Sequence, residues 1–168
     1  MSEKLKDMNN VVLRPVRLSD VDFLWDILYY AIFIPENETL PSRDIVKTPE
    51  ISLYMDNWGR HGDMGFIAEI NGTPIGAIWC RLFNDTDHAF GYIDKSIPEL
   101  GMAIIPGYRG QGLGSKMLEK LIDETKLLGY KGISLSVDIR NPANYLYRKF
   151  GFIEVGSSGN TICMKKEI

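Results

Sequence analysis

The sequence predicts a single α+β domain, because strand-like and helix-like segments follow one another in mixed order along its 168 residues. Two observations support this prediction most strongly. An Asn-Gly dipeptide at 71–72 separates two strand-like runs, which indicates an antiparallel hairpin. A glycine-rich segment, "IPGYRGQGLG" at 105–114, follows another strand-like run and leads into an amphipathic helix. The full pattern predicts the order β-α-α-β-β-β-α-β-α-β-β.

The N-terminal third is expected to hold one strand and two helices. The run "VVLRPVRL" at 11–18 alternates apolar and polar residues, as a half-buried strand does, and Ser19 is placed to cap the helix that follows. Three prolines between 34 and 49 predict an irregular, exposed loop. Thr48 before Pro49 then predicts the start of a second helix, which ends near Gly59.

The remaining elements are predicted from local patterns. Residues 64–83 are expected to form the two strands of the hairpin, and "ELGMAII" at 99–105 a further strand that Pro106 ends. A helix follows Gly114 and terminates at Gly129. The last part contains the strand "GISLSVD", a short helix opened by Asn141-Pro142, and the closing strands "FIEVG" and "TICMKKE".

Composition excludes several classes of function. The formal net charge of −3 argues against a nucleic-acid partner, because such proteins usually carry a basic excess. No run approaches the roughly 18 apolar residues of a membrane span, so we expect a cytoplasmic protein without a membrane partner. Cys80 and Cys163 match neither a disulfide framework nor a metal-ligand spacing, so we interpret both as buried thiols and expect no metal.

The glycine-rich segment indicates a phosphate-binding loop, since the first amides of a helix have no intrahelical acceptor and attract anions. A nucleoside-triphosphate P-loop requires Gly-Lys-Ser/Thr, whereas this chain has Gly114-Ser115-Lys116. A dinucleotide fold requires G-x-G-x-x-G after its first strand, but here the glycines are spaced G-x-G-x-G. Only 30 residues follow Asp138, too few for the remaining strand-helix repeats of that fold.

A third phosphate loop fits the spacing. The run Arg109-Gly110-Gln111-Gly112-Leu113-Gly114 matches the R/Q-x-x-G-x-G/A signature of the GCN5-related N-acetyltransferases, and "ELGMAIIPGYRGQGLGSKML" and "LSVDIRNPANYLYRKFGF" resemble that family's coenzyme A motif and the following strand and helix. The resemblance implies a mixed, mostly antiparallel sheet of six to seven strands with about four helices, splayed between its fourth and fifth strands. It implies one domain over 1–168, with a coenzyme A core at about 99–152 and acceptor-site elements mainly at 18–98. A bulge is expected in "GMAII".

The same resemblance implies which residues bind the coenzyme. Backbone amides of the glycine-rich segment would hold the pyrophosphate, and the end of the preceding strand would pair with the pantetheine arm. Asn141 and Asn144 would contact the pantetheine or the adenine side, although Asn141 is equally well explained as the cap of its helix. The expected coenzyme contacts are Ala103, Ile104, Ile105, Arg109, Gly110, Gln111, Gly112, Leu113, Gly114, Ser115, Asn141 and Asn144.

Two side chains are candidates for proton transfer. Tyr147 aligns with the family tyrosine that protonates the departing thiolate, a role that suits a phenol with an ordinary pKa near 10. The alternative is a core tyrosine packed under the sheet. An alkyl amine with a pKa near 10.4 is only about 0.1% neutral at pH 7, so a base is expected, and Glu99 at the start of the glycine-bearing strand is the candidate. The alternative for Glu99 is an exposed residue at a strand end.

The acceptor site is expected between the first two helices and on the hairpin. Trp79 and Arg81 share one face of their strand and are candidates for its floor. The aromatic candidates are also explained as ordinary core residues. The proposed acceptor contacts are Tyr29, Phe33, Glu36, Trp79 and Arg81.

Together these observations predict an acetyl-coenzyme A-dependent N-acetyltransferase in which an amine attacks the thioester directly. Acetyl-coenzyme A is the co-substrate, no metal is expected, and the partner is a small-molecule or peptide amine, with a homodimer possible. The alternatives are an inactive module that binds coenzyme A, or an acyltransferase that uses another acyl donor or a hydroxyl acceptor.

Overall fold

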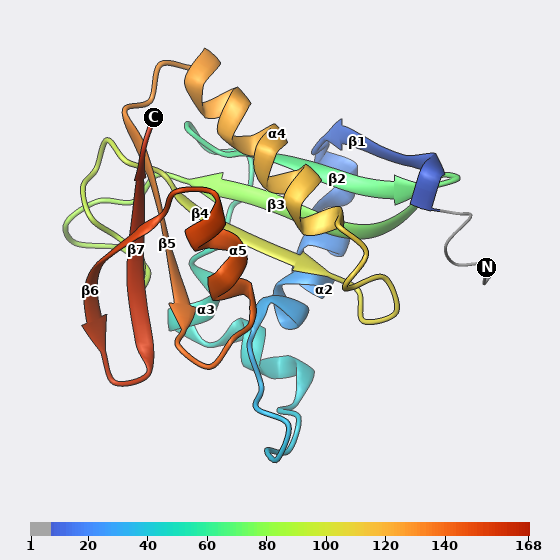
Figure 1. Cartoon of the computed structure of the whole chain (residues 1–168), viewed down its shortest axis with the longest axis horizontal. Helices are drawn as coiled ribbons and strands as arrows, with labels where there is room; N and C mark the ends of the chain where they lie inside the picture. The colour runs from blue at the N-terminus through green and yellow to red at the C-terminus, as the bar shows by residue number, and fades with distance from the viewer. Residues whose placement is uncertain (1–7) are drawn as a thin grey trace.

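The chain forms one seven-stranded sheet in the computed structural model, which describes residues 8–168 (Figure 1). The strand order is β1-β2-β3-β4-β5-β7-β6, and every neighbouring pair is antiparallel except β4 and β5. This confirms the mixed, mostly antiparallel sheet. The strands are β1 (Val11–Pro15), β2 (Met64–Ile70), β3 (Thr73–Arg81), β4 (Glu99–Ile104), β5 (Gly132–Asp138), β6 (Ile153–Ser158) and β7 (Thr161–Glu167).

The splay between the fourth and fifth strands is also confirmed. β4 and β5 pair only at Glu99 and Ser134, and then diverge, as the yellow and orange arrows in Figure 1 show. The bulge expected in "GMAII" is wrong, because β4 pairs with β3 in unbroken register from Ile104 to Glu99. The gap opens because β5 turns away after one residue pair, while β4 stays regular.

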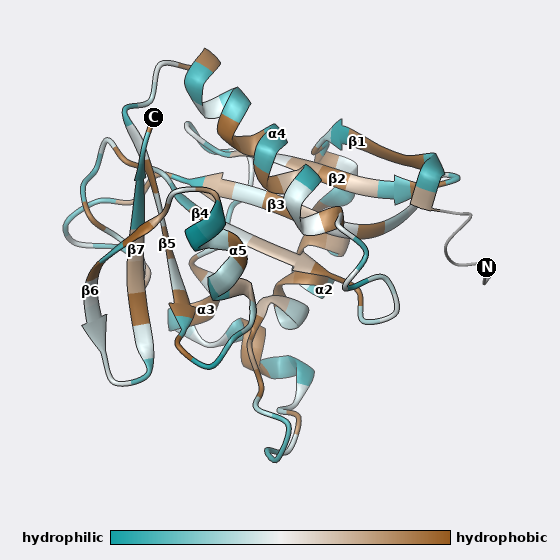
Figure 2. Ribbon diagram, in the orientation of Figure 1, coloured by the Kyte–Doolittle hydropathy of each residue, from teal (hydrophilic) through white to brown (hydrophobic). Residues whose placement is uncertain are grey.

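Helices cover both faces of the N-terminal half of the sheet (Figure 1). α4 packs on one face through residues such as Met117 and Leu121, and α2 packs on the other through Leu24 and Ile27. Hydrophobic residues follow the central strands, whereas α4 alternates between hydrophobic and hydrophilic along its length (Figure 2). The helices are α2 (Val21–Ala31), α3 (Pro49–Ser52), α4 (Leu113–Leu127) and α5 (Ala143–Lys149), with 3₁₀ turns at Met8–Asn10, Leu18–Asp20 and Arg43–Lys47.

Several local predictions are confirmed. Asn71 and Gly72 both have positive φ, 50° and 80°, as a tight hairpin requires. Gly129 follows α4 with a φ of 81°, which agrees with its expected role at the helix end. Both cysteines are free, but only Cys80 is fully buried, and Cys163 is half-buried.

The start of the chain differs from the prediction in two ways. β1 ends at Pro15 instead of residue 18, although the N–H of Val16 still donates to Gly65 O at 3.0 Å. Ser19 does not cap α2, because a 3₁₀ turn precedes the helix and Asp20 occupies the N-cap position. The carboxylate of Asp20 is bound instead by Arg14 and by the N–H of Arg17.

The region between α2 and β2 holds less helix than predicted. The helix that starts at Pro49 ends at Ser52 instead of near Gly59, because turns follow it and Asn57 adopts a φ of 53°. Thr48 is the N-cap as expected, but its hydroxyl donates to Ile45 O. Within the expected irregular loop, the 3₁₀ turn at Arg43–Lys47 buries Val46.

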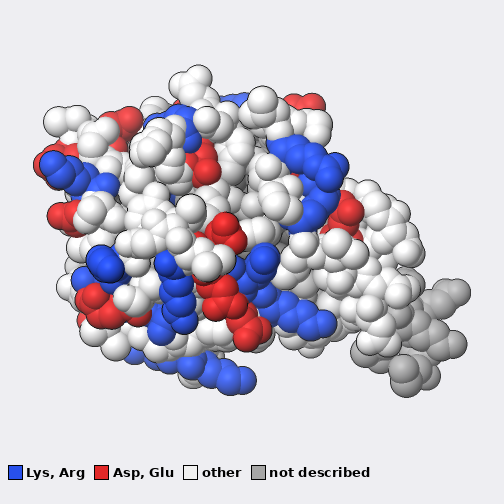
Figure 3. All heavy atoms as spheres, turned by 90° about the horizontal axis from the view of Figure 1, so that it is seen from above, with Lys and Arg blue, Asp and Glu red and all other residues white. Residues whose placement is uncertain are grey.

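Charged side chains are interspersed on the surface. In Figure 3 basic and acidic residues alternate across the face seen from above, so no large patch of one sign forms there. This distribution agrees with the near balance of 19 basic and 22 acidic residues. Within residues 8–168, no helix has the length and apolar content needed to cross a membrane.

Candidate active site

The glycine-rich segment connects β4 to α4 and depends on two left-handed residues. Gly110 and Gly112 have φ values of 73° and 81°, and Gly112 is the N-cap of α4. A Cβ atom at either position would meet nothing within 4 Å. Backbone conformation therefore favours glycine at both positions, and the space beside them is open to a ligand.

The backbone N–H groups from Arg109 to Ser115 have no acceptor among residues 8–168. The first intramolecular bond after this run is from Lys116 N to Gly112 O, at 3.3 Å. These amides lie at the N-terminal end of the 15-residue helix α4, where the helix dipole is positive. The arrangement fits the phosphate oxygens of a nucleotide-containing coenzyme.

Two side chains hold this loop in place. Arg109 Nε donates to Ile104 O at 2.8 Å, and Arg109 Nη2 donates to Tyr30 O at 3.3 Å. The guanidinium thereby ties the loop to the ends of β4 and α2. Gln111 Nε2 donates weakly to Gly107 O at 3.5 Å, and its buried Oε1 has no partner among the described residues.

The edge of β4 that faces the splay is free beyond its first residue. Ile105 N donates to Ile75 O at 2.8 Å, toward β3, and N–H groups alternate between the two edges of a strand. The N–H groups of Ile104 and Met102 therefore point toward the gap that β5 leaves. Ala103 pairs with Ala77 of β3, and its side chain is buried in the core under α2. Sequence analysis did not identify Met102 as part of this edge.

α5 lies beside the glycine-rich segment, because Gly114 lets the two segments approach. A Cβ at Gly114 would lie 3.2 Å from Leu146 Cδ2 of α5. Asn141 Oδ1 accepts the N–H of Ala143 at 2.9 Å, which is the capping interaction considered for it. Asn144 Oδ1 accepts from Arg148 Nε at 3.0 Å.

Tyr147 is buried in the same helix. Its ring packs edge-on against Phe152, with the ring centroids 5.9 Å apart. Burial raises the pKa of Tyr147 to about 12, so the phenol is protonated at neutral pH. It therefore has a core packing role, and its hydroxyl still carries a proton that it could donate.

Glu99 is buried and not exposed at a strand end, which rejects that alternative. Its side chain is 1% exposed, Oε2 accepts a hydrogen bond from Tyr54, and Oε1 has no partner among residues 8–168. Burial raises the pKa of Glu99 to about 7, and the hydrogen bond from Tyr54 and the nearby backbone N–H of Gly91 oppose this rise. A carboxyl group with this pKa can exchange a proton at neutral pH.

The loop before β4 enters the splay at Gly91. A Cβ at this position would lie 2.8 Å from Glu99 Cδ and 2.7 Å from the carbonyl carbon of Leu135. The thiol of Cys163 lies 3.6 Å from Gly91 O. The gap next to Glu99 therefore has room for glycine but not for a residue with a side chain. The Gly91 loop encloses the carboxyl group on the β5 side.

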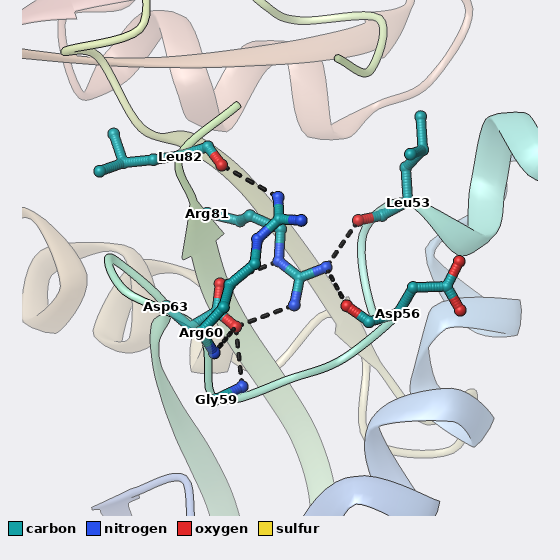
Figure 4. Close-up of polar contacts among 7 residues, drawn as sticks. All are labelled: Leu53, Asp56, Gly59, Arg60, Asp63, Arg81 and Leu82. Carbon is teal, nitrogen blue, oxygen red and sulfur yellow. Dashed lines mark hydrogen bonds and ion pairs between the residues drawn. The ribbon is translucent and has the colours of Figure 1, made fainter. Parts of the chain in front are cut away.

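Arg81 lies opposite Glu99 on β3 but turns toward the segment that follows α3 (Figure 4). Its Nε and Nη2 each bind Asp63 at 2.8 Å, and its Nη1 donates to Leu53 O and Asp56 O at 2.7 Å each. The residue is completely buried. Four internal hydrogen bonds therefore engage this guanidinium.

Trp79 is adjacent to Arg81 on the same face, as the spacing predicted. Its indole crosses β4 at Gly101, where an added Cβ would lie 2.5 Å from the ring. The side chain is 1% exposed, and its Nε1 has no partner within the described part of the chain. Trp79 is thus part of the core under α2, with one unused donor.

The remaining acceptor candidates lie around the end of α2. Tyr29 OH donates to Pro41 O at 2.8 Å, and Arg43 stacks over the Tyr29 ring at 4.5 Å. Phe33 is half-buried, whereas Glu36 is exposed. Tyr29 is in α2, and Phe33 and Glu36 belong to the α2–α3 connection. Trp79 and Arg81 share the face of Glu99.

Sequence analysis missed Tyr54 and Gly91 at this site. Tyr54 is 45 residues from Glu99 in the sequence, Gly91 lies in the loop just before β4, and neither belongs to a recognisable motif. Only the pairing of β3 with β4 and the path of the connecting loops bring them together.

Residues 28–152 of the chain match the family model described as the acetyltransferase (GNAT) family. An uncharacterized N-acetyltransferase of Methanocaldococcus jannaschii is 29% identical over 97 residues, which cover 56% of this chain and 41% of that protein. The [ribosomal protein bS18]-alanine N-acetyltransferase of Haemophilus influenzae is 44% identical over 54 residues, 32% of this chain and 37% of the relative. The matches thus span about two fifths of these relatives.

The fold also resembles solved acetyltransferase structures. The PaiA N-acetyltransferase of Thermoplasma acidophilum, in complex with coenzyme A, superposes with a TM-score of 0.69 at 18% identity. The superposition covers 94% of this chain and 99% of that one. At this identity the likeness establishes the shared fold.

Proposed function

Because this chain belongs to the acetyltransferase (GNAT) family, we propose that it is an acetyl-coenzyme A-dependent N-acetyltransferase acting on a primary amine. The observation that carries the proposal is the layout of β4. The buried carboxyl group of Glu99 lies at one end of this strand, and backbone N–H groups without acceptors follow its other end. Between them, the edge of the strand next to β5 is unpaired. The proposed binding site for the acetyl donor and the proposed base are thus placed by one rigid strand.

Binding of the co-substrate uses backbone groups. The N–H groups from Arg109 to Ser115 hold the pyrophosphate, and the edge of β4 at Met102 and Ile104 pairs with the pantetheine amides. Ala103 and Ile105 support this edge from the β3 side. Asn141 caps the start of α5 and Asn144 accepts from Arg148 on the same helix, and their remaining polar atoms are proposed to contact the coenzyme. The co-substrate supplies an acetyl thioester, and the protein supplies its alignment.

Proton transfer assigns one role to each of two buried side chains. Glu99 accepts a proton from the acceptor ammonium group, directly or through a water molecule, and the neutral nitrogen then attacks the thioester carbonyl carbon. A carbon–nitrogen bond forms and the carbon–sulfur bond breaks, while the nitrogen gives its second proton to water. Tyr147 protonates the departing thiolate, and both side chains regain their starting state by exchange with water.

The acceptor itself is proposed as a small-molecule or peptide amine. It enters on the side of the sheet that carries Trp79 and the α2–α3 connection, with Tyr29, Phe33 and Glu36 at its rim. The buried Nε1–H of Trp79 has no partner in the described part of the chain, so an acceptor oxygen that reaches it would satisfy an unpaired donor. A relative that acetylates ribosomal protein alanine makes a peptide that starts with alanine a useful member of any substrate panel.

The test is thiol release from acetyl-coenzyme A with a panel of amines, combined with mass spectrometry of the products. The panel contains an alkyl diamine, a free amino acid and a peptide that starts with alanine. We expect release with at least one amine, an acetamide product, and a loss of turnover in Glu99→Gln. Tight coenzyme binding without release for any amine would favour an inactive binding module. Preference for a longer acyl thioester would indicate a different acyl donor, and an ester product would indicate a hydroxyl acceptor.

A further inference from the structure

Tyr54 stands out because it is the one side chain that hydrogen-bonds to Glu99 in the described part of the chain. It lies just after α3, and its ring packs edge-on against Phe83 with centroids 6.0 Å apart. The hydroxyl donates to Glu99 Oε2. Because this bond occupies one carboxylate oxygen, it leaves Oε1 as the oxygen that can receive a proton from an acceptor.

The turn that carries Tyr54 is fastened by Arg81 (Figure 4). The two carbonyl groups that Arg81 Nη1 binds, those of Leu53 and Asp56, lie on either side of Tyr54 along the chain. Asp63 closes the same loop, since its Oδ2 accepts from the N–H of Gly59 at 2.8 Å as well as from Arg81. A fully buried ion pair therefore fixes the position of the Tyr54 backbone.

We propose that Tyr54 is a positioning residue for Glu99, and that Arg81 acts through Tyr54 by clamping its turn. The inference rests on the proposed role of Glu99 as the base. It gives Arg81 a function at the acceptor site without direct contact with the acceptor. The sequence predicted the face of β3 on which Arg81 lies, but its guanidinium binds the turn after α3 instead of lining an open acceptor pocket.

The surroundings of Glu99 decide what removal of the Tyr54 hydroxyl does. The titratable groups that face it are Tyr54 from the turn and Cys163 from β7, whose pKa the Glu99 charge helps to raise. Arg81 pairs with Glu99 across β3 and β4, but its guanidinium turns away to bind Asp63. The hydrogen bond from Tyr54 favours the ionised carboxylate and lowers its pKa. Without the hydroxyl, the Glu99 pKa rises, and the base becomes ionised only at higher pH.

The first experiment compares Tyr54→Phe with Tyr92→Phe in the pH profile of kcat/KM. Tyr92 is a matched control, because it also donates to a carboxylate, that of Asp85, in an exposed turn. We expect the rising limb of Tyr54→Phe to move to higher pH by about one unit, with about tenfold less activity near pH 6.5 and recovery near pH 9. Tyr92→Phe keeps the original profile. An unchanged limb, or the same loss at every pH, would overturn the inference.

The second experiment tests the clamp with Arg81→Lys and the double variant with Tyr54→Phe. Lysine retains a charge for Asp63 but cannot bind two carbonyls and a carboxylate in the geometry of a guanidinium. We expect a shift in the same direction, and no additional shift in the double variant, because Arg81 acts through the hydroxyl. Shifts that add would overturn this part. Arg60→Lys is the control, since Arg60 binds Leu82 O and neither clamped carbonyl.

Two measurements keep these outcomes interpretable. Circular dichroism checks that each variant is folded, and Asp63→Asn replaces Arg81→Lys in the same comparison if the latter does not fold. Glu99→Gln separates the two proposals. If it keeps full turnover, the base assignment fails and the role of Tyr54 fails with it. If it loses turnover while Tyr54→Phe keeps the original pH profile, only the positioning role is overturned.

Discussion

The proposed donor and acceptor sides of this molecule are built in different ways. The donor side uses backbone groups from one continuous segment, 102–115, that includes the end of β4, a glycine-rich loop and the start of α4. The acceptor side uses side chains from separate segments, in which Tyr54 donates to Glu99 and Arg81 binds the backbone carbonyls on either side of Tyr54. A backbone site needs glycines at fixed spacing and leaves a motif in the sequence. A site assembled from distant side chains leaves no such motif.

The largest effect is expected where the two sides meet, at Tyr147. Tyr147→Phe removes the proposed donor of the proton to the thiolate, and we expect turnover to fall by about 10²- to 10⁴-fold. Tyr145→Phe is the control, since Tyr145 lies on the same helix but is 81% exposed. Steady-state thiol release measures both. Equal turnover in Tyr147→Phe and the parent would leave Tyr147 with the core packing role alone.

The donor side can be tested with two equivalent glycines at opposite ends of α4. Gly112 and Gly129 have the same φ of 81°, and a Cβ at either would meet no atom within 4 Å. Leucine at either position therefore costs a similar strain, about 1–2 kcal/mol of unfolding free energy. Calorimetric titration should show at least tenfold weaker acetyl-coenzyme A binding for Gly112→Leu only. Equal affinity for acetyl-coenzyme A in both variants would contradict the proposal that this loop binds the pyrophosphate.

Burial of Glu99 predicts a pH-dependent stability on the acceptor side. Its pKa is about 7 in the folded chain and 4.5 ordinarily, so the unfolded chain loses this proton first. The folded state is therefore favoured at low pH and loses that advantage as the pH rises through 7. The free energy of unfolding of Glu99→Gln, measured in urea and compared with that of the parent, should therefore rise by about 2 kcal/mol between pH 5 and pH 8. A constant difference between the two proteins would contradict this burial.

The smallest effect is expected where the two sides touch at the surface. Glu38 in the α2–α3 connection lies 3.8 Å from Arg140 in the β5–α5 connection, and both side chains are exposed. Such pairs contribute about 0.2–1 kcal/mol, so Glu38→Ala should change unfolding free energy and the KM for acetyl-coenzyme A only slightly. A large rise in that KM would show that the contact between these connections matters for donor binding.

The sequence predicted the elements whose signals are local. The Asn71-Gly72 hairpin, the start and end of α4, and the position of Glu99 on its strand all follow from spacing and glycine content. The helix predicted after Thr48 was too long, because Arg81 holds the carbonyls of Leu53 and Asp56 in a turn. A tertiary contact there outweighs local helix propensity.

Side-chain environments were harder to predict than elements. Arg81 was assigned to an acceptor pocket because it shares one face of its strand with Trp79, yet Asp63 and two carbonyls satisfy it inside the protein. Nothing in the sequence pairs Tyr54 with Glu99. The expected bulge in β4 depended on resemblance alone, and the divergence of β5 after Ser134 opens the splay without it.

The separation of the two sides is tested most directly by initial rates at varied acetyl-coenzyme A, measured with one accepted amine for Glu99→Gln and Gly112→Leu in parallel. We expect Glu99→Gln to lower kcat with an unchanged KM for acetyl-coenzyme A, because only proton removal from the amine is lost. Gly112→Leu should raise that KM and approach the parental kcat at saturation. Changes in the same parameter for both variants would contradict the division of this site into a backbone donor loop and a buried base.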